Sequence, residues 1–398
     1  MNYTKINEEI LAKLNALVGS ENVLTSDDKL KEYSHDEVTD PAYHHLPEVV
    51  VMAENTNQVA AVVKLANEFH FPVTPRGAGT GLACGAVPIY GGVVLSLEKM
   101  NKIIEINEDA MYAIVEPGVR TSDLQKAVDA KGCLYAGDPC SGDSCFIGGN
   151  IATNAGGNKA VKYGTTRHQI YSIEIVNPQG KIVNLGARLQ KQTTGYCMDQ
   201  LVIGSEGTLG IITKATLKLV PKPEYMMDLL AVYTDRTSAI NTVGKILKAG
   251  ITPTCVEFMD NATIKSVEKY LNTSLQQSDT GNYLIVEVEG INEDDLDEKA
   301  MKLDEICSEM GATDVLVADH DSIWRARKNY SEAIRTETPH LSKEDIVMPI
   351  DLEPDLLAEI LRCAEKYKLD TRIVSHAGDG NIHLNILWPQ DEDYEDWH

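Results

Sequence analysis

A glycine-rich segment between residues 75 and 86 constrains the fold of this chain more than any other stretch. It reads PRGAGTGLACGA and carries four glycines, at Gly77, Gly79, Gly81 and Gly85. Glycine leaves backbone amides uncovered and accepts positive φ, so successive N–H groups can turn inward around an anion such as a diphosphate. An apolar strand predicted over 71–74 leads into the segment. We therefore predict an anion-binding loop that follows a strand.

Two common nucleotide motifs do not fit this loop. No Lys-Ser or Lys-Thr pair follows its last glycine, which excludes a P-loop, and Leu82 takes the place of the third glycine of a Rossmann fingerprint. Arg76 could add positive charge and Thr80 a hydroxyl. A surface turn is the alternative, since glycine-rich turns are common. The loop favours a dinucleotide bound outside a Rossmann fold.

Two further glycine-rich stretches lie in the same half of the chain. Residues 148–157 are small, polar and almost uncharged, and Asn150, Thr153 and Asn154 there offer donors and acceptors. Residues 204–212 read GSEGTLGII, and between the two stretches a hairpin is predicted over 170–185 with its turn at 177–180. Three such stretches favour one shared ligand over three unrelated turns.

Length and charge limit the classes of function. A chain of 398 residues allows two or three domains, and a net charge of −24 argues against binding nucleic acid or an anionic membrane surface. No apolar run is long enough for a membrane-spanning helix, and the N-terminus lacks the apolar region of a signal peptide. The eight cysteines form no C-x-x-C pair, which is typical of reduced thiols. We expect a cytoplasmic protein.

The sequence pattern changes after Lys222, which predicts two domains, 1–222 and 223–398. The second begins strand (229–233), helix (238–249), strand (254–259), strand (283–288), helix (295–310) and strand (313–318). This β-α-β-β-α-β order is typical of a ferredoxin-like fold. Further helices are predicted over 323–334 and 353–367.

The sharpest chemical signal is SHAGDGNIHLN, at residues 375–385. His383 and Asn385 would share one face of a strand, because side chains repeat every two residues. A turn at 378–380 would fold His376 back toward His383. Two imidazoles beside an amide suit zinc, iron or manganese in a site completed by a carboxylate. The alternative is two unrelated histidines at a loop edge.

A second candidate lies over 324–343. Arg327 could hold a carboxylate through a bidentate fork, and Ser331 would lie one turn later on the same helix face. Lys343 precedes an apolar strand predicted over 346–348. Without the histidine motif, a solvated charged helix would explain this stretch as well.

Together these motifs resemble the FAD-linked oxidases of the vanillyl-alcohol oxidase/PCMH type, in the D-lactate/glycolate dehydrogenase branch. The similarity runs from about residue 40 to about 388 and includes GGN-x-A-T-N-A-G-G, GSEGTLG-I and H-x-G-D-G-N-x-H. It implies an α+β chain in which a two-subdomain PCMH-type FAD-binding domain precedes a ferredoxin-like substrate (cap) domain with an antiparallel sheet.

The resemblance also implies the site residues. FAD would be bound by Pro75, Arg76, Gly77, Ala78, Gly79, Thr80, Gly81, Pro117, Gly118, Asp138, Pro139, Gly148, Gly149, Asn150, Ala152, Thr153, Asn154, Gly156, Gly157, Glu206, Gly207, Gly210, Ile211 and Ile212. His376 and His383 would bind a divalent metal (Fe²⁺, Zn²⁺ or Mn²⁺) that orients the substrate. Asn385 would lie beside the substrate, and Arg327 and Lys343, with Ser331, would neutralise its carboxylate.

One departure from the family concerns the C-terminus. The family continues past this point to a Glu-His-Gly motif that supplies a third metal ligand and the catalytic base, whereas this sequence stops at Trp397-His398. We expect both groups beyond residue 398, unless the site is built differently.

The resemblance implies oxidation of D-lactate to pyruvate by hydride transfer to flavin N5, with electrons passing to an electron-transfer flavoprotein or another redox protein. Glycolate and D-2-hydroxyglutarate are alternative substrates, and a dicarboxylate would need a further cation such as Arg325 or Lys343. A non-catalytic flavin-binding electron-relay subunit and a zinc hydrolase are further alternatives.

Overall fold

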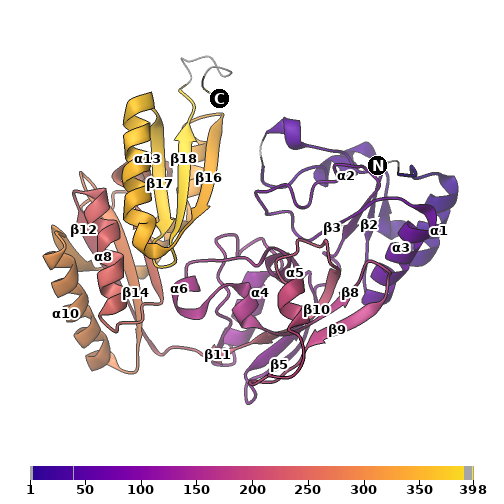
Figure 1. Cartoon of the computed structure of the whole chain (residues 1–398), viewed down its shortest axis with the longest axis horizontal. Coiled ribbons are helices and arrows are strands. Elements are labelled where there is room, and N and C mark those ends of the chain that lie inside the picture. The colour runs from indigo at the N-terminus through magenta and orange to yellow at the C-terminus, as the bar shows by residue number, and fades with distance from the viewer. Residues whose placement is uncertain (1–2, 39, 390–396, 398) are drawn as a thin grey trace. The chain divides into compact units, whose positions relative to one another are not determined.

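The computed structural model describes residues 3–38, 40–389 and 397 and divides the chain into two compact units (Figure 1). The first comprises residues 1–156 and 164–222, and the second residues 157–163 and 223–398. Each unit is considered by itself below.

A four-stranded sheet forms one half of the first unit. Its order is β1-β2-β4-β3, with β1 (Val23–Leu24) antiparallel to β2 (Val49–Met52), while β2 and β3 (Val73–Arg76) run parallel to β4 (Val93–Ser96). Helices α1 (Glu8–Val18) and α3 (Thr56–Phe69) cover one face of the sheet, and Leu30 of α2 (Asp27–Glu32) packs on the other. The strand predicted over 71–74, before the glycine loop, is present as β3, two residues later in the sequence.

A five-stranded antiparallel sheet forms the other half of this unit. Its order is β5 (Ile103–Asn107), β6 (Tyr112–Val115), β10 (Ile211–Lys218), β8 (Ile170–Val176) and β9 (Ile182–Gly186). Helices α4 (Thr121–Asp129) and α5 (Ile147–Thr153) pack on it. The smaller elements are α7 (Met198–Val202) and the pair β7 (Cys133–Leu134) and β11 (Val220–Pro221). The predicted hairpin is β8–β9.

The second unit is a seven-stranded antiparallel sheet of order β15-β12-β14-β13-β17-β18-β16. The first four strands are β12 (Tyr225–Tyr233), β13 (Cys255–Met259), β14 (Asn282–Gly290) and β15 (Asp314–Val317). With α8 (Arg236–Lys248) and α10 (Glu293–Glu309) they make the predicted ferredoxin-like fold. The additional strands are β16 (Leu341–Val347), β17 (Asp370–His376) and β18 (Asn381–Leu387).

Both faces of this sheet are covered, so its strands are apolar on both sides. Leu229 and Ala231 of β12 pack with α8, α10 and α13 (Glu353–Tyr367), whose helices lie side by side in Figure 1. Leu230 and Val232, which alternate with them, pack with α9 (Asn261–Leu271), α11 (His320–Lys328) and α12 (Tyr330–Arg335).

Two predictions in this unit need correction. The helix expected over 323–334 is broken at Asn329 into α11 and α12, so Arg327 and Ser331 do not share one continuous helix face. Lys343 lies within β16 and does not precede a strand, because that strand starts at Leu341. The short helix α6 (Ala160–Tyr163) belongs to this unit although the residues on either side of 157–163 belong to the first.

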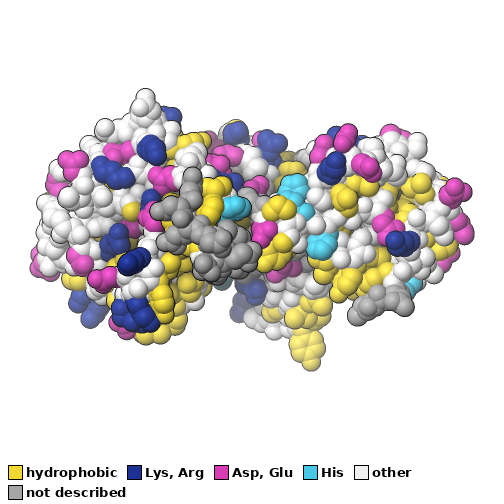
Figure 2. Space-filling model, turned by 90° about the horizontal axis from the view of Figure 1, so that it is seen from above, with side chains coloured by type: hydrophobic (Ala, Val, Ile, Leu, Met, Phe, Trp, Pro, Cys, Tyr) yellow, Lys and Arg dark blue, Asp and Glu magenta, His cyan; other side chains and the backbone are white. Residues whose placement is uncertain are grey.

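Charged groups of both signs are mixed over the face drawn in Figure 2, where Lys and Arg side chains alternate with Asp and Glu side chains. No helix among the described residues is long and apolar enough to cross a bilayer.

Candidate active site

The three glycine-rich stretches meet around α5 in the first unit. A Cβ added to Gly77 of the first loop would lie 3.7 Å from the backbone nitrogen of Gly149 in α5. From the third stretch, the amides of Gly204 and Glu206 donate to the carbonyls of Ile151 (3.0 Å) and Ala152 (2.8 Å). Segments far apart in sequence thus form one backbone-lined region.

The glycines of this region have two distinct roles. Gly79 has φ +74°, and a side chain at Gly148 would come within 2.5 Å of Pro117 Cβ, so both are required by the fold itself. Gly149 and Gly156 instead have no protein atom within 4 Å of an added Cβ. Bare backbone beside open space is what a flat ligand needs for close approach, and it fits FAD.

The polar side chains of α5 and of Asn154, which follows it, make hydrogen bonds within the first unit. Asn150 Nδ2 donates to Thr121 Oγ1 (2.8 Å), and Thr153 Oγ1 donates to the carbonyl of Gly149 (3.1 Å). Asn154, in a left-handed conformation, accepts from the Arg167 amide (2.9 Å). These groups tie the loops together, because polar atoms beside a packed helix need partners.

Arg76 is also used internally. Its side chain is buried, and Nη1 donates to the carbonyl of His35 (2.6 Å) while the guanidinium lies over the Tyr33 ring. Burial lowers the pKa of this guanidinium. Arg76 therefore supports the glycine loop from behind, with its guanidinium against Gly79.

The remaining predicted cofactor residues come from several separate segments. Ala78, Thr80 and Gly81 are within the first loop, and Gly81 accepts from the amide of Glu37 (3.0 Å). The others in the first unit lie in β3, the β6–α4 turn, the loop after β7, the loop before β10 and the buried start of β10: Pro75, Gly118, Asp138, Pro139, Gly207, Gly210, Ile211 and Ile212. Gly157 belongs to the second unit.

In the second unit, the β17–β18 hairpin brings the two motif histidines together. The rings of His376 and His383 are 5.0 Å apart between centroids and nearly perpendicular (84°). Each ring presents Nδ1 to a carboxylate: His376 to Glu257 Oε1 (2.8 Å) and His383 to Asp345 Oδ1 (3.2 Å). With Nδ1 of each ring at a carboxylate, Nε2 is the nitrogen through which each histidine would bind zinc, iron or manganese.

Burial lowers the pKa of His383; the hydrogen bond that His383 donates to Asp345 opposes this shift, and the nearby His376 adds to it. A neutral imidazole is the form that a metal requires. The hydrogen bond with His383 in turn holds the pKa of Asp345 below its ordinary value.

Glu257 is the functional residue that sequence reasoning missed. It is completely buried on β13 and accepts from Arg327 Nε (2.9 Å) and Nη2 (2.7 Å) as well as from His376. Burial alone would raise the pKa of Glu257, but its contacts with His376 and Arg327 hold it low. The only signal in the sequence was one acidic residue inside an apolar strand.

Lys343 and Asn385 lie opposite each other in the β16–β18 pairing. Lys343 Nζ donates to Ser331 Oγ (3.0 Å), so these two predicted residues meet despite the broken helix. Asn385 is buried and donates weakly to the Arg372 carbonyl (3.4 Å). Tyr330 lies between Arg327 and His383. Its ring is 5.0 Å from the Arg327 guanidinium and stacks on the His383 ring, with 6.3 Å between the ring centroids.

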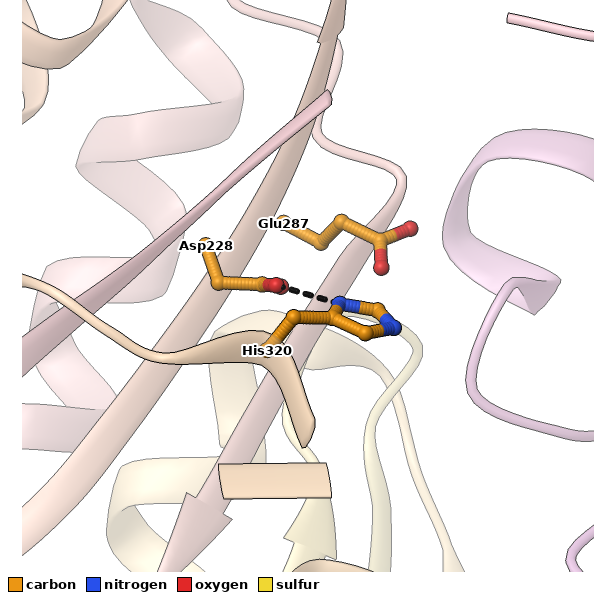
Figure 3. A group of neighbouring side chains, drawn as sticks. All are labelled: Asp228, Glu287 and His320. Atoms are coloured by element: carbon orange, nitrogen blue, oxygen red, sulfur yellow. Dashed lines mark hydrogen bonds and ion pairs between the residues drawn. The ribbon is translucent and has the colours of Figure 1, made fainter. Parts of the chain in front are cut away.

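A separate group could also hold a metal. Asp228 on β12, Glu287 opposite it on β14 and His320 at the start of α11 have ligand atoms within 4.8 Å of one another (Figure 3). Asp228 already accepts from His320 Nδ1 (2.6 Å) and Trp324 Nε1 (2.9 Å). No sequence spacing pointed to this group, because its members come from three separate elements.

Comparison with known proteins supports the flavin interpretation. Residues 47–186 match the FAD binding domain model, and residues 222–398 match the C-terminal domain of FAD linked oxidases. A D-lactate dehydrogenase of Anaerostipes hadrus is 38% identical over 392 residues (96% of this chain, 82% of that protein). The glycolate oxidase subunit GlcD of Bacillus subtilis is 36% identical (95% and 80%), and a D-2-hydroxyglutarate dehydrogenase of Stutzerimonas stutzeri is 34% identical (98% and 84%).

Among solved structures, p-cresol methylhydroxylase has the same fold, with a TM-score of 0.80 at 19% identity over 96% of this chain and 82% of that one. Alkyldihydroxyacetonephosphate synthase matches with a TM-score of 0.79 at 18% identity over 100% and 79%. The resemblance seen in the sequence motifs is confirmed, as is the α+β architecture.

Proposed function

The chain belongs to the FAD-linked oxidases, and from this premise we propose that it oxidises a D-2-hydroxy acid, with D-lactate as substrate and pyruvate as product. The observation that carries the proposal is the cluster of His376, His383 and Arg327 on the second unit, with Lys343 close by. The similarity to D-lactate dehydrogenase over nearly the whole chain supports it.

We assign each residue of the cluster a role. His376 and His383 would hold a divalent metal through Nε2, and Lys343 would bind the substrate carboxylate by a charge-assisted hydrogen bond. Arg327 adds hydrogen-bond donors held in a fixed position. Asn385 lies on the same strand as His383. When bound, FAD supplies the two-electron acceptor and the metal supplies a Lewis acid for the 2-hydroxyl.

The charge balance favours a substrate with one carboxylate. Glu257 offsets the charge of Arg327 within one buried pair, so Lys343 is the cation that we assign to the substrate. Arg325, the other cation considered for a dicarboxylate, is exposed on α11. Lactate and glycolate therefore fit the cluster better than 2-hydroxyglutarate.

Anaerobic flavin reduction tests this proposal directly. The purified flavoprotein would be mixed with D-lactate, L-lactate, glycolate and D-2-hydroxyglutarate, and loss of the oxidised flavin's visible absorbance followed in time. We expect the highest rate per substrate concentration with D-lactate. Flavin that stays oxidised with all four acids would contradict the proposal and favour an electron-relay subunit.

A further inference from the structure

We propose that Glu257 is a positioning residue of the candidate active site, which fixes the tautomer of His376 so that Nε2 faces the metal and which holds Arg327 in place. This inference rests on the proposed function only in taking His376 as a metal ligand. Glu257 lies outside the histidine motif and outside the segment that carries Arg327.

The sheet itself places Glu257 beside His376. Phe258 of β13 lies opposite Ser375 of β17, and the strands are antiparallel, so the residue before Phe258 is a neighbour of the residue after Ser375. The Glu257 carboxylate reaches His376 Nδ1 with both oxygens, at 2.8 and 2.9 Å. Its side chain is 0% exposed, so water does not compete for these contacts.

An ionised carboxylate can only accept hydrogen bonds, so the histidine nitrogen that contacts it carries the proton. With the proton on Nδ1, the lone pair of a neutral His376 lies on Nε2. A metal-bound histidine is commonly oriented by a carboxylate in this way.

Arg327 further restricts which residue can occupy position 257. Its Nη2 lies 3.4 Å from His376 Nδ1, and both atoms are donors that converge on Glu257. Only a group that accepts on both sides satisfies them. A glutamine at position 257 has nearly the same shape, but its amide NH₂ would face either Arg327 or His376 with a donor. The histidine would respond by moving its proton to Nε2, which removes the metal-binding lone pair.

The chain offers a matched control. Glu287 is also a buried glutamate, on the neighbouring strand β14, and belongs to the separate Asp228, Glu287 and His320 group. Glu287→Gln therefore makes the same chemical change in the same sheet. It also tests whether a metal binds at that second group.

The experiment measures Zn²⁺ binding to chelator-treated flavoprotein, by competition with a chelating dye, for wild type, Glu257→Gln, Glu257→Asp and Glu287→Gln. We expect Glu257→Gln to weaken Zn²⁺ binding about 10–100-fold, Glu257→Asp to recover part of it, and Glu287→Gln to match wild type. Flavin content should be the same in all four. Unchanged Zn²⁺ affinity in Glu257→Gln would overturn the proposal, and so would loss of Zn²⁺ in Glu287→Gln alone.

A second measurement needs no substitution in the cluster's carboxylates. ¹⁵N NMR of histidine-labelled, zinc-free wild type should show His376 protonated on Nδ1, with its signal assigned by its absence from His376→Asn. Protonation on Nε2 would overturn the proposal even if Glu257→Gln failed to fold. Neither readout uses a hydroxy acid, so both stand if flavin reduction fails, and failure of both leaves the flavin test unaffected.

Discussion

Arg327 Nη2 and Glu257 Oε2 are 2.7 Å apart, in an ion pair whose side chains are 1% and 0% exposed. Each group offsets a charge that the interior of the second unit would otherwise hold alone. Removing one partner of such a pair is costly, because the other stays buried and uncompensated.

Substituting Arg327 by Met should therefore lower the free energy of unfolding of the second unit by about 3–5 kcal/mol. Denaturant unfolding followed by tryptophan fluorescence would report it, since Trp324 lies on the same helix. Arg325→Met is the control, because Arg325 is an exposed neighbour and should change stability little. An Arg327→Met protein as stable as wild type would show that the pair contributes nothing net.

Gly149→Ala tests the flavin-binding region without disturbing the fold. The added methyl meets no protein atom within 4 Å, and alanine is favoured over glycine in a helix, so the protein should stay folded. If the flavin approaches this backbone, the methyl should reduce flavin content and weaken FAD binding at least about tenfold, roughly 1.4 kcal/mol. Gly244→Ala in α8 is matched, since it also has open space around the new Cβ. Full flavin content in Gly149→Ala would place the cofactor elsewhere.

Lys343→Met should raise KM for D-lactate with a smaller effect on kcat. A hydrogen bond to a charged group contributes about 1.5–3 kcal/mol, which corresponds to roughly 10–150-fold. Steady-state kinetics with an artificial electron acceptor would measure both constants. Lys328→Met, which removes an exposed lysine of α11, should leave both unchanged. Equal KM values for wild type and Lys343→Met would remove Lys343 from the site.

Glu353 makes the stability of the second unit depend on pH. Burial raises its pKa from an ordinary value of 4.5 to about 7, although the Ser375 hydroxyl donates to it (2.5 Å); the charges of Asp379 and Glu257 add to the rise. The folded state then holds a proton that the unfolded chain has lost. The contribution of Glu353 to the free energy of unfolding is therefore complete below pH 4.5 and is lost as the pH rises through about 7.

Unfolding free energy should accordingly fall by about 3 kcal/mol between these limits, at 1.36 kcal/mol per pKa unit. Glu353→Gln should flatten that slope and stabilise the protein at alkaline pH. Glu359→Gln, an exposed change on the same helix, should keep the wild-type slope. Denaturation curves collected across this pH range would distinguish the two.

Local pattern predicted the features that are encoded locally. Glycine spacing located the loops of the first unit, and the lengths of the apolar runs gave the ferredoxin-like order. The turn at 378–380 placed His376 against His383. Helix α5 could not be predicted locally, because glycine and β-branched residues have low helix propensity and the helix forms through packing of Ile147 and Ile151.

Pairings across long stretches of sequence could not be predicted. Glu257 contacts Arg327 across 70 residues and His376 across 119. A single acidic residue in an apolar strand does not reveal which partner neutralises it. The partners of Asn150 and Asn154, which are Thr121 and Arg167, are likewise distant in sequence and could not be predicted.

The segment 157–163 gives the polypeptide an interlaced path. Lys162 and Tyr163 bind Glu289 of β14, and Val161 packs under Gly378, although residues 164–222 return to the first unit. No single cut can therefore separate the two halves cleanly. A fragment ending at residue 222 would contain residues 157–163 without the second-unit residues that they contact. The complementary fragment, 223–398, would lack this segment. The two units should therefore be expressed as one chain.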